Sequence, residues 1–247
     1  MLKMLRESEI NTCWNEINHK YEKYVIEYIN RTMNDGEFRL LYYQFFRSCN
    51  LDGMVISAMQ TALKLTVPGI PDNYQASELR NNHFTDPDNR EIPDFQELSG
   101  KLEKIMAIKS IEDINDMEDF IISGKLKLFV NYTILNFRKK HANLFYVNYN
   151  KIKADGEYSE DIIAFSRSYG RETIIVVVFR NTFSHLKEII SNDFGFYGNT
   201  VIIPELSGSF KNLITGRIVE IAGTIKIADI FDKVPFAVLY GVNDKDE

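Results

Sequence analysis

Apolar residues recur at spacings of three and four through most of the chain up to His141, which is the pattern of helices that bury one face. Asn34, Asp35 and Gly36 form a turn signal that ends the first periodic segment. The helices expected from this pattern span residues 16–33, 37–47, 51–65, 95–107 and 125–141. The third of them is apolar on most of its faces, so it is expected to lie against other elements.

The pattern changes at about Asn143 to short runs of β-branched and aromatic residues separated by Gly, Asn, Asp and Ser. The strands expected there span residues 162–165, 173–179, 200–204, 217–221 and 236–240. Residues 182–191 could form a short helix or an irregular excursion. The fold class expected is α+β, with a helical part over residues 1–143 and an antiparallel β-sandwich domain over residues 144–247.

Four of the six prolines lie between residues 67 and 93. Proline fixes its own φ, donates no backbone hydrogen bond and disfavours helix at the residue before it. This stretch is therefore expected to be loop, with one short strand near residues 70–75.

Composition narrows the class of protein. Hydrophobic residues make up 45% of the chain and charged residues 26%, which is enough apolar material for a sizeable core. The formal charge of −6 comes from acidic and basic residues that are well mixed, which argues against a nucleic-acid partner or a membrane surface. Cys13 and Cys49 cannot form a disulfide framework, and no apolar run reaches the ~18 residues of a membrane span. We therefore expect a cytoplasmic protein.

Common signatures of cofactor and metal chemistry are absent. The sequence has no GxGxxG, GxxxxGK[ST], HExxH or GxSxG motif, so a nucleotide-phosphate cradle, a zincin site and a nucleophile elbow have no support. The four histidines have no metal-ligand spacing between them. We expect neither a cofactor nor a metal.

The loop that follows residue 66 carries groups that a sugar site uses. Tyr74 could offer a ring face to a pyranose, while Asp72, Gln75 and Glu78 could bind its hydroxyl groups. The alternative is a plain connection in which Asp72 and Glu78 cap backbone N–H groups. Residue chemistry alone favours this alternative, because polar loops are common.

A second polar motif spans residues 86–90. Asp86, Asp88 and Asn89 have oxygen atoms suited to calcium, but the glycine and terminal glutamate of an EF-hand are missing and Arg90 can neutralise the acids. A turn stabilised by an internal ion pair is therefore the favoured interpretation.

These two motifs together resemble the maltooligosyl trehalose synthases. Residues 63–79, LKLTVPGIPDNYQASEL, and residues 86–95, DPDNREIPDF, are similar to a family pattern close to LKLTxPGxPDxYQGxEL followed by VDPDNRRPVDF. Thr12-Cys13-Trp14-Asn15 with Tyr21-Glu22 resembles an earlier segment of that family, and the runs at residues 163–167, 176–180, 212–216 and 236–239 resemble its C-terminal β domain. The resemblance thus covers nearly the whole chain.

The resemblance implies a fold and a role in trehalose biosynthesis. The family belongs to the α-amylase clan, glycoside hydrolase family 13, so the helical part would be the remnant last strand and helices of a TIM-type barrel. Its reaction is an isomerisation: intramolecular transglucosylation converts the reducing-end α-1,4 link of a maltooligosaccharide into an α,α-1,1 link. By resemblance the sugar would be bound by Asp72, Tyr74, Gln75, Glu78, Asp88, Asn89 and Arg90.

The resemblance also implies that this chain lacks the catalytic residues. The clan uses an Asp nucleophile, a Glu acid/base and a second Asp that stabilises the transition state, at the ends of barrel strands that precede the segment matched by Thr12-Cys13-Trp14. None of the three has a counterpart in this chain, so we expect it to be inactive by itself. It would also leave apolar surface at residues 51–65 and 67–70 that the other strands would bury, so we expect either self-association or helices repacked over the remaining strand.

Three roles stay open at this level. The chain could be half of a split enzyme completed by a complementary barrel polypeptide, a remnant that neither binds nor converts sugar, or a non-catalytic carbohydrate-binding or scaffold module. The partners expected are accordingly a maltooligosaccharide and either the barrel polypeptide or further copies of the chain.

Overall fold

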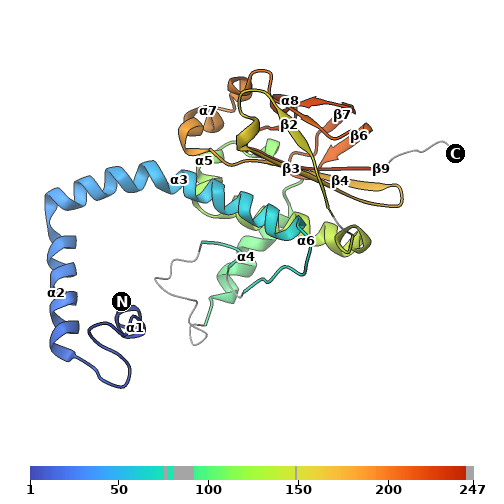
Figure 1. Cartoon of the computed structure of the whole chain (residues 1–247). Coiled ribbons are helices and arrows are strands. Elements are labelled where there is room, and N and C mark those ends of the chain that lie inside the picture. Colours follow the sequence, from blue (N-terminus) through green and yellow to red (C-terminus); the bar gives the residue numbers. More distant parts are fainter. Residues whose placement is uncertain (75–76, 81–91, 148, 243–247) are drawn as a thin grey trace. The chain divides into compact units, whose positions relative to one another are not determined.

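The computed structural model describes residues 1–74, 77–80, 92–147 and 149–242 (Figure 1). Their contacts divide the chain into two compact units, Met1–Asn50 with Asn81–Pro93, and Leu51–Arg80 with Asp94–Glu247. Helices dominate the described residues up to Phe145, and antiparallel strands dominate those after it. None of the helices described in this structure is both long enough and apolar enough to cross a membrane.

The first unit is helical. It contains α1 (Leu2–Glu7), α2 (His19–Asn34) and the first part of α3 (Gly36–Thr66). Helix α2 begins where Asn18 accepts a hydrogen bond from the N–H of Tyr21, so the helix predicted over residues 16–33 is confirmed.

A polar cluster joins α1 to α2 within this unit. Arg6 donates two hydrogen bonds to the Glu22 carboxylate, at 2.8 and 2.9 Å, and Thr12 donates a third at 2.9 Å. The hydrogen bonds from Arg6 lower the pKa of Glu22 the most and that from Thr12 lowers it further, to about 2. The guanidinium of Arg6 also lies 5.0 Å from the centre of the Trp14 ring. Thr12, Trp14 and Glu22, which carry the resemblance at this end of the chain, therefore hold two helices together.

Helix α3 is continuous, whereas two separate helices were expected over residues 37–47 and 51–65. The intervening Ser48, Cys49 and Asn50 lower helix propensity by only a few tenths of a kcal/mol each, and no proline interrupts the segment. The first proline after it is Pro68, so the helix runs on through Leu65 and Thr66.

The strand predicted near residues 70–75 is wrong over the residues that the structure describes. Residues 70–74 form no strand, and residue 75 lies outside the described residues. The β-like run Leu65-Thr66-Val67 begins inside α3, because Leu65 and Thr66 are both buried as part of the periodic face of that helix.

The second unit adds three further helices, α4 (Phe95–Met106), α5 (Met117–Ile122) and α6 (Lys125–Lys140), with 3-10 turns at Ile111–Asp113 and Ala142–Phe145. Asp94 caps α4 by accepting from the N–H of Glu97 at 2.9 Å. Gly124 precedes α6 at a φ of 78°, and a Cβ there would lie 3.3 Å from the backbone nitrogen of Arg80. The helices predicted over residues 95–107 and 125–141 are confirmed to within one residue.

The strands form two antiparallel sheets. The six-stranded sheet has the order β1-β3-β4-β9-β6-β7 and the three-stranded sheet the order β2-β5-β8. Their bounds are β1 Asn150–Lys151, β2 Lys153–Asp155, β3 Ile162–Tyr169, β4 Glu172–Phe179, β5 Val201–Ile203, β6 Ser207–Asn212, β7 Ile218–Ala222, β8 Ile225–Lys226 and β9 Phe236–Val242. All five predicted strands are present. The sequence pattern missed β6, whose run SGSFKN is largely polar, and the short β1, β2 and β8, which are defined by their pairing.

The excursion at residues 182–191 contains a 3-10 turn, Phe183–His185, and the short helix α7, Leu186–Ile190. A second short helix, α8 at Ile227–Ile230, follows β8 directly.

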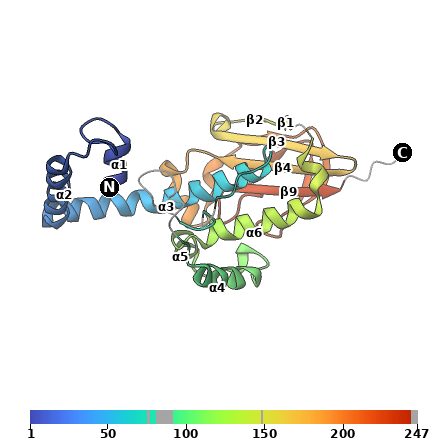
Figure 2. The ribbon, with the colours of Figure 1, turned by 90° about the horizontal axis from the view of Figure 1, so that it is seen from below.

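Strand β4 lies at the centre of two hydrophobic cores. Ile174, Val176 and Val178 pack with residues of α3 and α6, while Ile175 and Val177 pack with residues of the three-stranded sheet. Figure 2 shows α6 and the second half of α3 along the sheet that contains β3, β4 and β9. Complete burial of a Val or Ile side chain contributes roughly 1.5–3 kcal/mol, so this strand is a main source of stability.

The apolar surface expected on residues 51–65 is mostly covered. The buried apolar residues of this part of α3 are Leu51, Met54, Val55, Ala58, Met59, Ala62 and Leu65. The face of the six-stranded sheet and α6 cover them, so packing within this chain buries most of that surface. Val67 and Ile70 are exposed as predicted, at 38% and 92%.

A polar cluster ties the end of α6 to the sheet. His141 Nδ1 lies 2.5 Å from Glu172 Oε1, and the hydroxyl of Tyr240 donates to the same oxygen at 2.6 Å. The Phe137 ring stacks on His141 at 4.4 Å between centroids. The Tyr240 hydrogen bond, and after it the contact with His141, lower the pKa of Glu172, while burial and Glu172 raise that of Tyr240 to about 12.

We expect Glu172→Gln to lower the free energy of unfolding by about 1 kcal/mol near neutral pH, because a charged acceptor of two hydrogen bonds is lost. The folded pKa of Glu172 lies below the ordinary value of 4.5, so its contribution is complete above that pH and is lost as the pH falls through the folded pKa. The two proteins should therefore differ at neutral pH and converge in acid.

Urea denaturation followed by circular dichroism, at neutral and at acidic pH, measures this difference. Glu220→Gln is the matched control, because Glu220 is an exposed carboxylate on β7, and it should leave stability unchanged. An equal difference for Glu172→Gln at both pH values would contradict the prediction.

Candidate functional site

The loop that follows α3 is held from the last turns of the helix. Lys64 Nζ donates to the carbonyl oxygen of Asp72 at 3.1 Å and to Oδ1 of Asn73 at 2.8 Å. Further along, the carbonyl oxygen of Tyr74 accepts from both the N–H and the hydroxyl of Ser77. The loop therefore has a defined path through residues 67–74.

A second lysine holds the far end of this loop. Lys127 Nζ, from α6, donates to the carbonyl oxygen of buried Leu79 at 3.3 Å. Burial, and then the charge of Lys64, lower the pKa of Lys127, while Glu78 acts in the opposite direction. Two ammonium groups and one carboxylate thus lie close enough to influence one another.

The predicted site residues divide into two sets. Asp72 is exposed, and Tyr74 and Glu78 are half-buried in the same loop. Gln75, Asp88, Asn89 and Arg90 lie outside the described residues. Within the described parts of the chain, neither the Asp72 nor the Glu78 carboxylate accepts a hydrogen bond from a backbone N–H, as the capping alternative required. Sugar binding by these residues stays a prediction.

The start of the loop is anchored by two arginines that sequence reasoning did not single out. Arg138 Nη1 donates to the carbonyl oxygen of Leu65 at 2.6 Å, and Arg167 Nη1 donates to that of Thr66 at 2.9 Å. Arg138 comes from α6 and Arg167 from β3. Lys64 and Lys127 were missed as well, because lysine and arginine at helix and strand positions are ordinarily solvated and their partners are distant in sequence.

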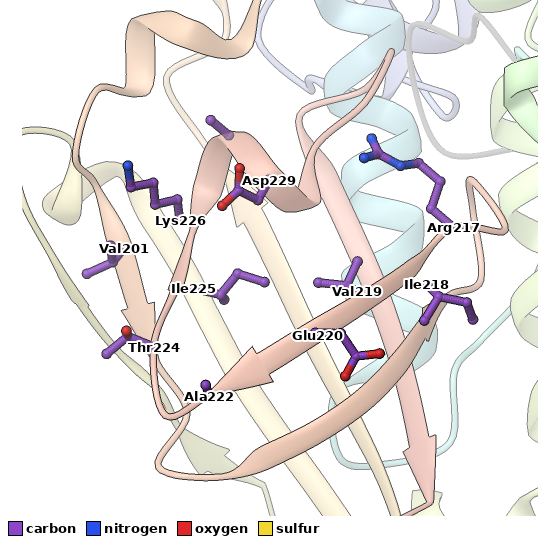
Figure 3. A pocket seen from close by; sticks show the side chains of 11 residues that line it. Val201, Arg217, Ile218, Val219, Glu220, Ala222, Thr224, Ile225, Lys226 and Asp229 are labelled. Atoms are coloured by element: carbon purple, nitrogen blue, oxygen red, sulfur yellow. The ribbon is translucent and has the colours of Figure 1, made fainter.

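The β domain has a separate hollow of about 570 Å³ between β7 and the β8–α8 segment (Figure 3). Its charged lining residues, Arg217, Glu220, Lys226 and Asp229, are all exposed. Arg217 Nη1 already lies 3.2 Å from Asp232 Oδ2. None of the described residues that line the hollow is aromatic, so they offer no ring face on which a sugar would stack. The loop after α3 is therefore the better candidate site.

Metal binding finds no support in the geometry of the described residues, where no three His, Cys, Asp or Glu side chains gather as a metal ion would need.

No protein-family model matches this chain. A curated protein of Mycobacterium tuberculosis that carries the provisional name maltooligosyl trehalose synthase is 25% identical over 238 residues, covering 96% of this chain and 27% of that protein. A crystal structure of a maltooligosyl trehalose synthase is 26% identical with a TM-score of 0.68, covering 97% of this chain and 29% of its own.

The structure of maltooligosyltrehalose synthase from Arthrobacter ramosus has the same fold, with a TM-score of 0.74 at 24% identity, over 96% of this chain and 29% of its own. The chain therefore spans less than a third of the length of the relatives that it matches. Over nearly all of its own length, this chain is a homologue of a part of the maltooligosyl trehalose synthases.

Proposed function

We propose that this chain is the C-terminal part of a maltooligosyl trehalose synthase and that it acts in the cytoplasm. Such an enzyme converts the reducing-end α-1,4 link of a maltooligosaccharide into an α,α-1,1 link. The single observation that carries the proposal is the alignment with relatives of that name, which covers 96% of this chain in sequence and 97% in structure.

The proposal also gives each part of the fold a role. Helices α3 to α6 correspond to the end of a TIM-type barrel, and the two antiparallel sheets to a β-sandwich of the α-amylase C-terminal type. We keep residue 143 as the boundary between the two parts. The helices bury their apolar faces against the six-stranded sheet, so the two sides of this boundary share one core. The boundary therefore marks two parts of the parent enzyme and does not separate two independently folding domains.

The loop after α3 contributes sugar contacts in this proposal. The residues assigned to them are Asp72, Tyr74, Gln75, Glu78, Asp88, Asn89 and Arg90. Support comes from the exposed Asp72 carboxylate and the half-buried Tyr74 ring in a loop held by Lys64. A ring face and hydroxyl-binding groups side by side are what recognition of a pyranose requires.

Chemistry at the sugar needs a nucleophilic carboxylate and an acid that lie about 5 Å apart. In the proposed enzyme these groups come from the barrel strands that this chain does not match. The carboxylates of the loop orient the sugar, and the chain by itself binds without converting.

The first test is therefore turnover by the isolated chain. Incubation of the purified chain with maltopentaose should yield no non-reducing product, because loss of a catalytic carboxylate set costs on the order of a millionfold in rate. Loss of reducing ends is the measurement, and a full-length synthase of the family is the positive control. Turnover that Asp72→Asn or Glu78→Gln abolishes would contradict the proposal and would establish those two residues as a new catalytic pair.

A complementary barrel is the proposed partner, and the first unit carries the surface for it. Phe38, Leu41, Tyr42 and Phe45 recur at helical spacing on α3, and each is between 38% and 68% exposed. The Phe38 and Tyr42 rings stack at 6.1 Å. Extended apolar surface of this kind is ordinarily covered by a partner. We assign it to the barrel segment that makes up the rest of the relatives' length, supplied within the same polypeptide or by another.

In solution this apolar face should make the chain associate with itself when the barrel segment is absent. Sedimentation velocity should show association that rises with concentration, and the double variant Leu41→Glu with Phe45→Glu should reduce it at least tenfold, since burying two charges opposes the contact. Gln44→Glu, at an exposed polar position of the same helix, is the matched control.

Co-expression with the barrel segment of a maltooligosyl trehalose synthase should replace self-association by a one-to-one complex. A monodisperse monomer in its absence would refute this role of the surface. Homo-oligomers that persist in its presence would assign the surface to further copies of this chain.

A further inference from the structure

Helix α3 ends at Thr66, and its last carbonyl groups have no partner within the helix. Arg138 and Arg167 supply those partners, at 2.6 Å to Leu65 and at 2.9 Å to Thr66. Arg167 also donates to the carbonyl oxygen of Val147. The two guanidinium groups reach one helix terminus from different elements, α6 and β3, within one compact unit.

Ending a helix with buried guanidinium groups has a desolvation cost. Arg167 is fully buried, and its Nε has no hydrogen-bond partner within the described part of the chain. Among the described residues, neither arginine forms an ion pair with a carboxylate. Burial lowers the pKa of both groups, and the charge of Arg138 lowers that of Arg167 further. An unpaired buried charge is ordinarily destabilising, and apolar residues of similar volume would pack at lower cost.

Three features of the site offset that cost. The C-terminus of a helix carries partial negative charge, which favours cations beside its last carbonyl groups. The hydrogen bonds to Leu65 and Thr66 satisfy donors and acceptors together. The guanidinium carbons of Arg138 and Arg167 also lie 4.2 Å and 5.6 Å from the centre of the Phe145 ring. Cation–π attraction at these distances stabilises both charges.

The helix end that they hold controls the candidate loop. Only Val67 separates Thr66 from Pro68, whose ring fixes φ, so a rotation of the Thr66 carbonyl is passed directly into the loop. Lys64, in the same last turn of α3, binds the carbonyl of Asp72 and the side chain of Asn73. Fraying of that turn would move Lys64 and the loop together.

We infer that Arg138 and Arg167 are positioning residues, which set the last turn of α3 and thereby place Asp72 and Tyr74 for a maltooligosaccharide. The inference rests on the proposed function for its ligand. It goes beyond that function because the position of the loop then depends on Arg167, a buried residue of strand β3. The β domain is then a support for sugar binding, although it does not touch the sugar.

The test compares sugar affinity with stability in the full chain. The variants are Arg138→Met, Arg167→Met and Arg167→Lys, and each is measured for maltopentaose binding by calorimetry and for melting temperature. Ile221→Ala is the matched control, because it removes buried apolar volume from the other core, away from α3. It should lower the melting temperature and leave the affinity unchanged.

We expect both methionine variants to weaken maltopentaose binding at least about tenfold, because small displacements of binding groups have effects of that order or larger. Arg167→Lys should recover part of the loss, since it keeps one charged donor. Affinity that falls in proportion to melting temperature in every variant, Ile221→Ala included, would overturn the inference. Unchanged affinity in folded arginine variants would overturn it as well.

Hydrogen exchange separates this inference from the proposed function. The backbone amides of the last turn of α3, residues 63–66, and that of Val67, which donates to the carbonyl oxygen of Leu63, should lose protection in Arg138→Met and Arg167→Met and keep it in Ile221→Ala. If the unchanged chain bound no maltopentaose, the proposed function would fail and sugar would be removed as the ligand of the loop. The positioning role would then be decided by exchange alone, and unaltered protection in the arginine variants would refute it.

Discussion

The burial of strand β4 on both faces is the constraint on which the rest of the structure depends. Its residues Ile174 to Phe179 alternate between a core shared with α3 and α6 and a core shared with the three-stranded sheet. A strand with two apolar faces cannot lie at a solvated surface, so helices must cover one side and a second layer the other. This requirement explains why the helices and the strands of the second unit form one compact body.

That constraint extends to the candidate site through α3. The second half of the helix is buried along the sheet, so its direction is determined by apolar packing. Its final turn is determined differently, by the guanidinium groups of Arg138 and Arg167 and by the ammonium group of Lys64. Apolar contacts tolerate small sliding, whereas hydrogen bonds from a planar guanidinium define direction. The loop therefore begins at the point where packing gives way to directional contacts.

The proposed function assigns sugar binding to this chain and the reacting groups to the part of its relatives that it does not match. Under the proposed function, the described loop supplies the groups that recognise hydroxyls and a sugar ring, held at a helix terminus. Glycosyl transfer needs in addition a nucleophile and an acid at a fixed separation. Binding and positioning groups can persist on one part of a barrel while reacting groups lie on another, because each strand of a barrel contributes its own loop to the site.

Local patterns determined much of this protein. Helical spacing identified α2, α4 and α6, and β-branched runs identified β3, β4, β5, β7 and β9, because each of these elements buries a face that its own sequence defines. The motifs at residues 63–79 and 86–95 pointed to a family that the comparisons support. The same reasoning placed a strand where α3 continues, since Leu65-Thr66-Val67 suits either conformation and only the surrounding core selects the helix. Tertiary structure alone decided that Arg167 would meet Thr66, 101 positions away in the chain. Nothing local to either residue encodes that contact, because it forms only when the sheet and the helix have packed together.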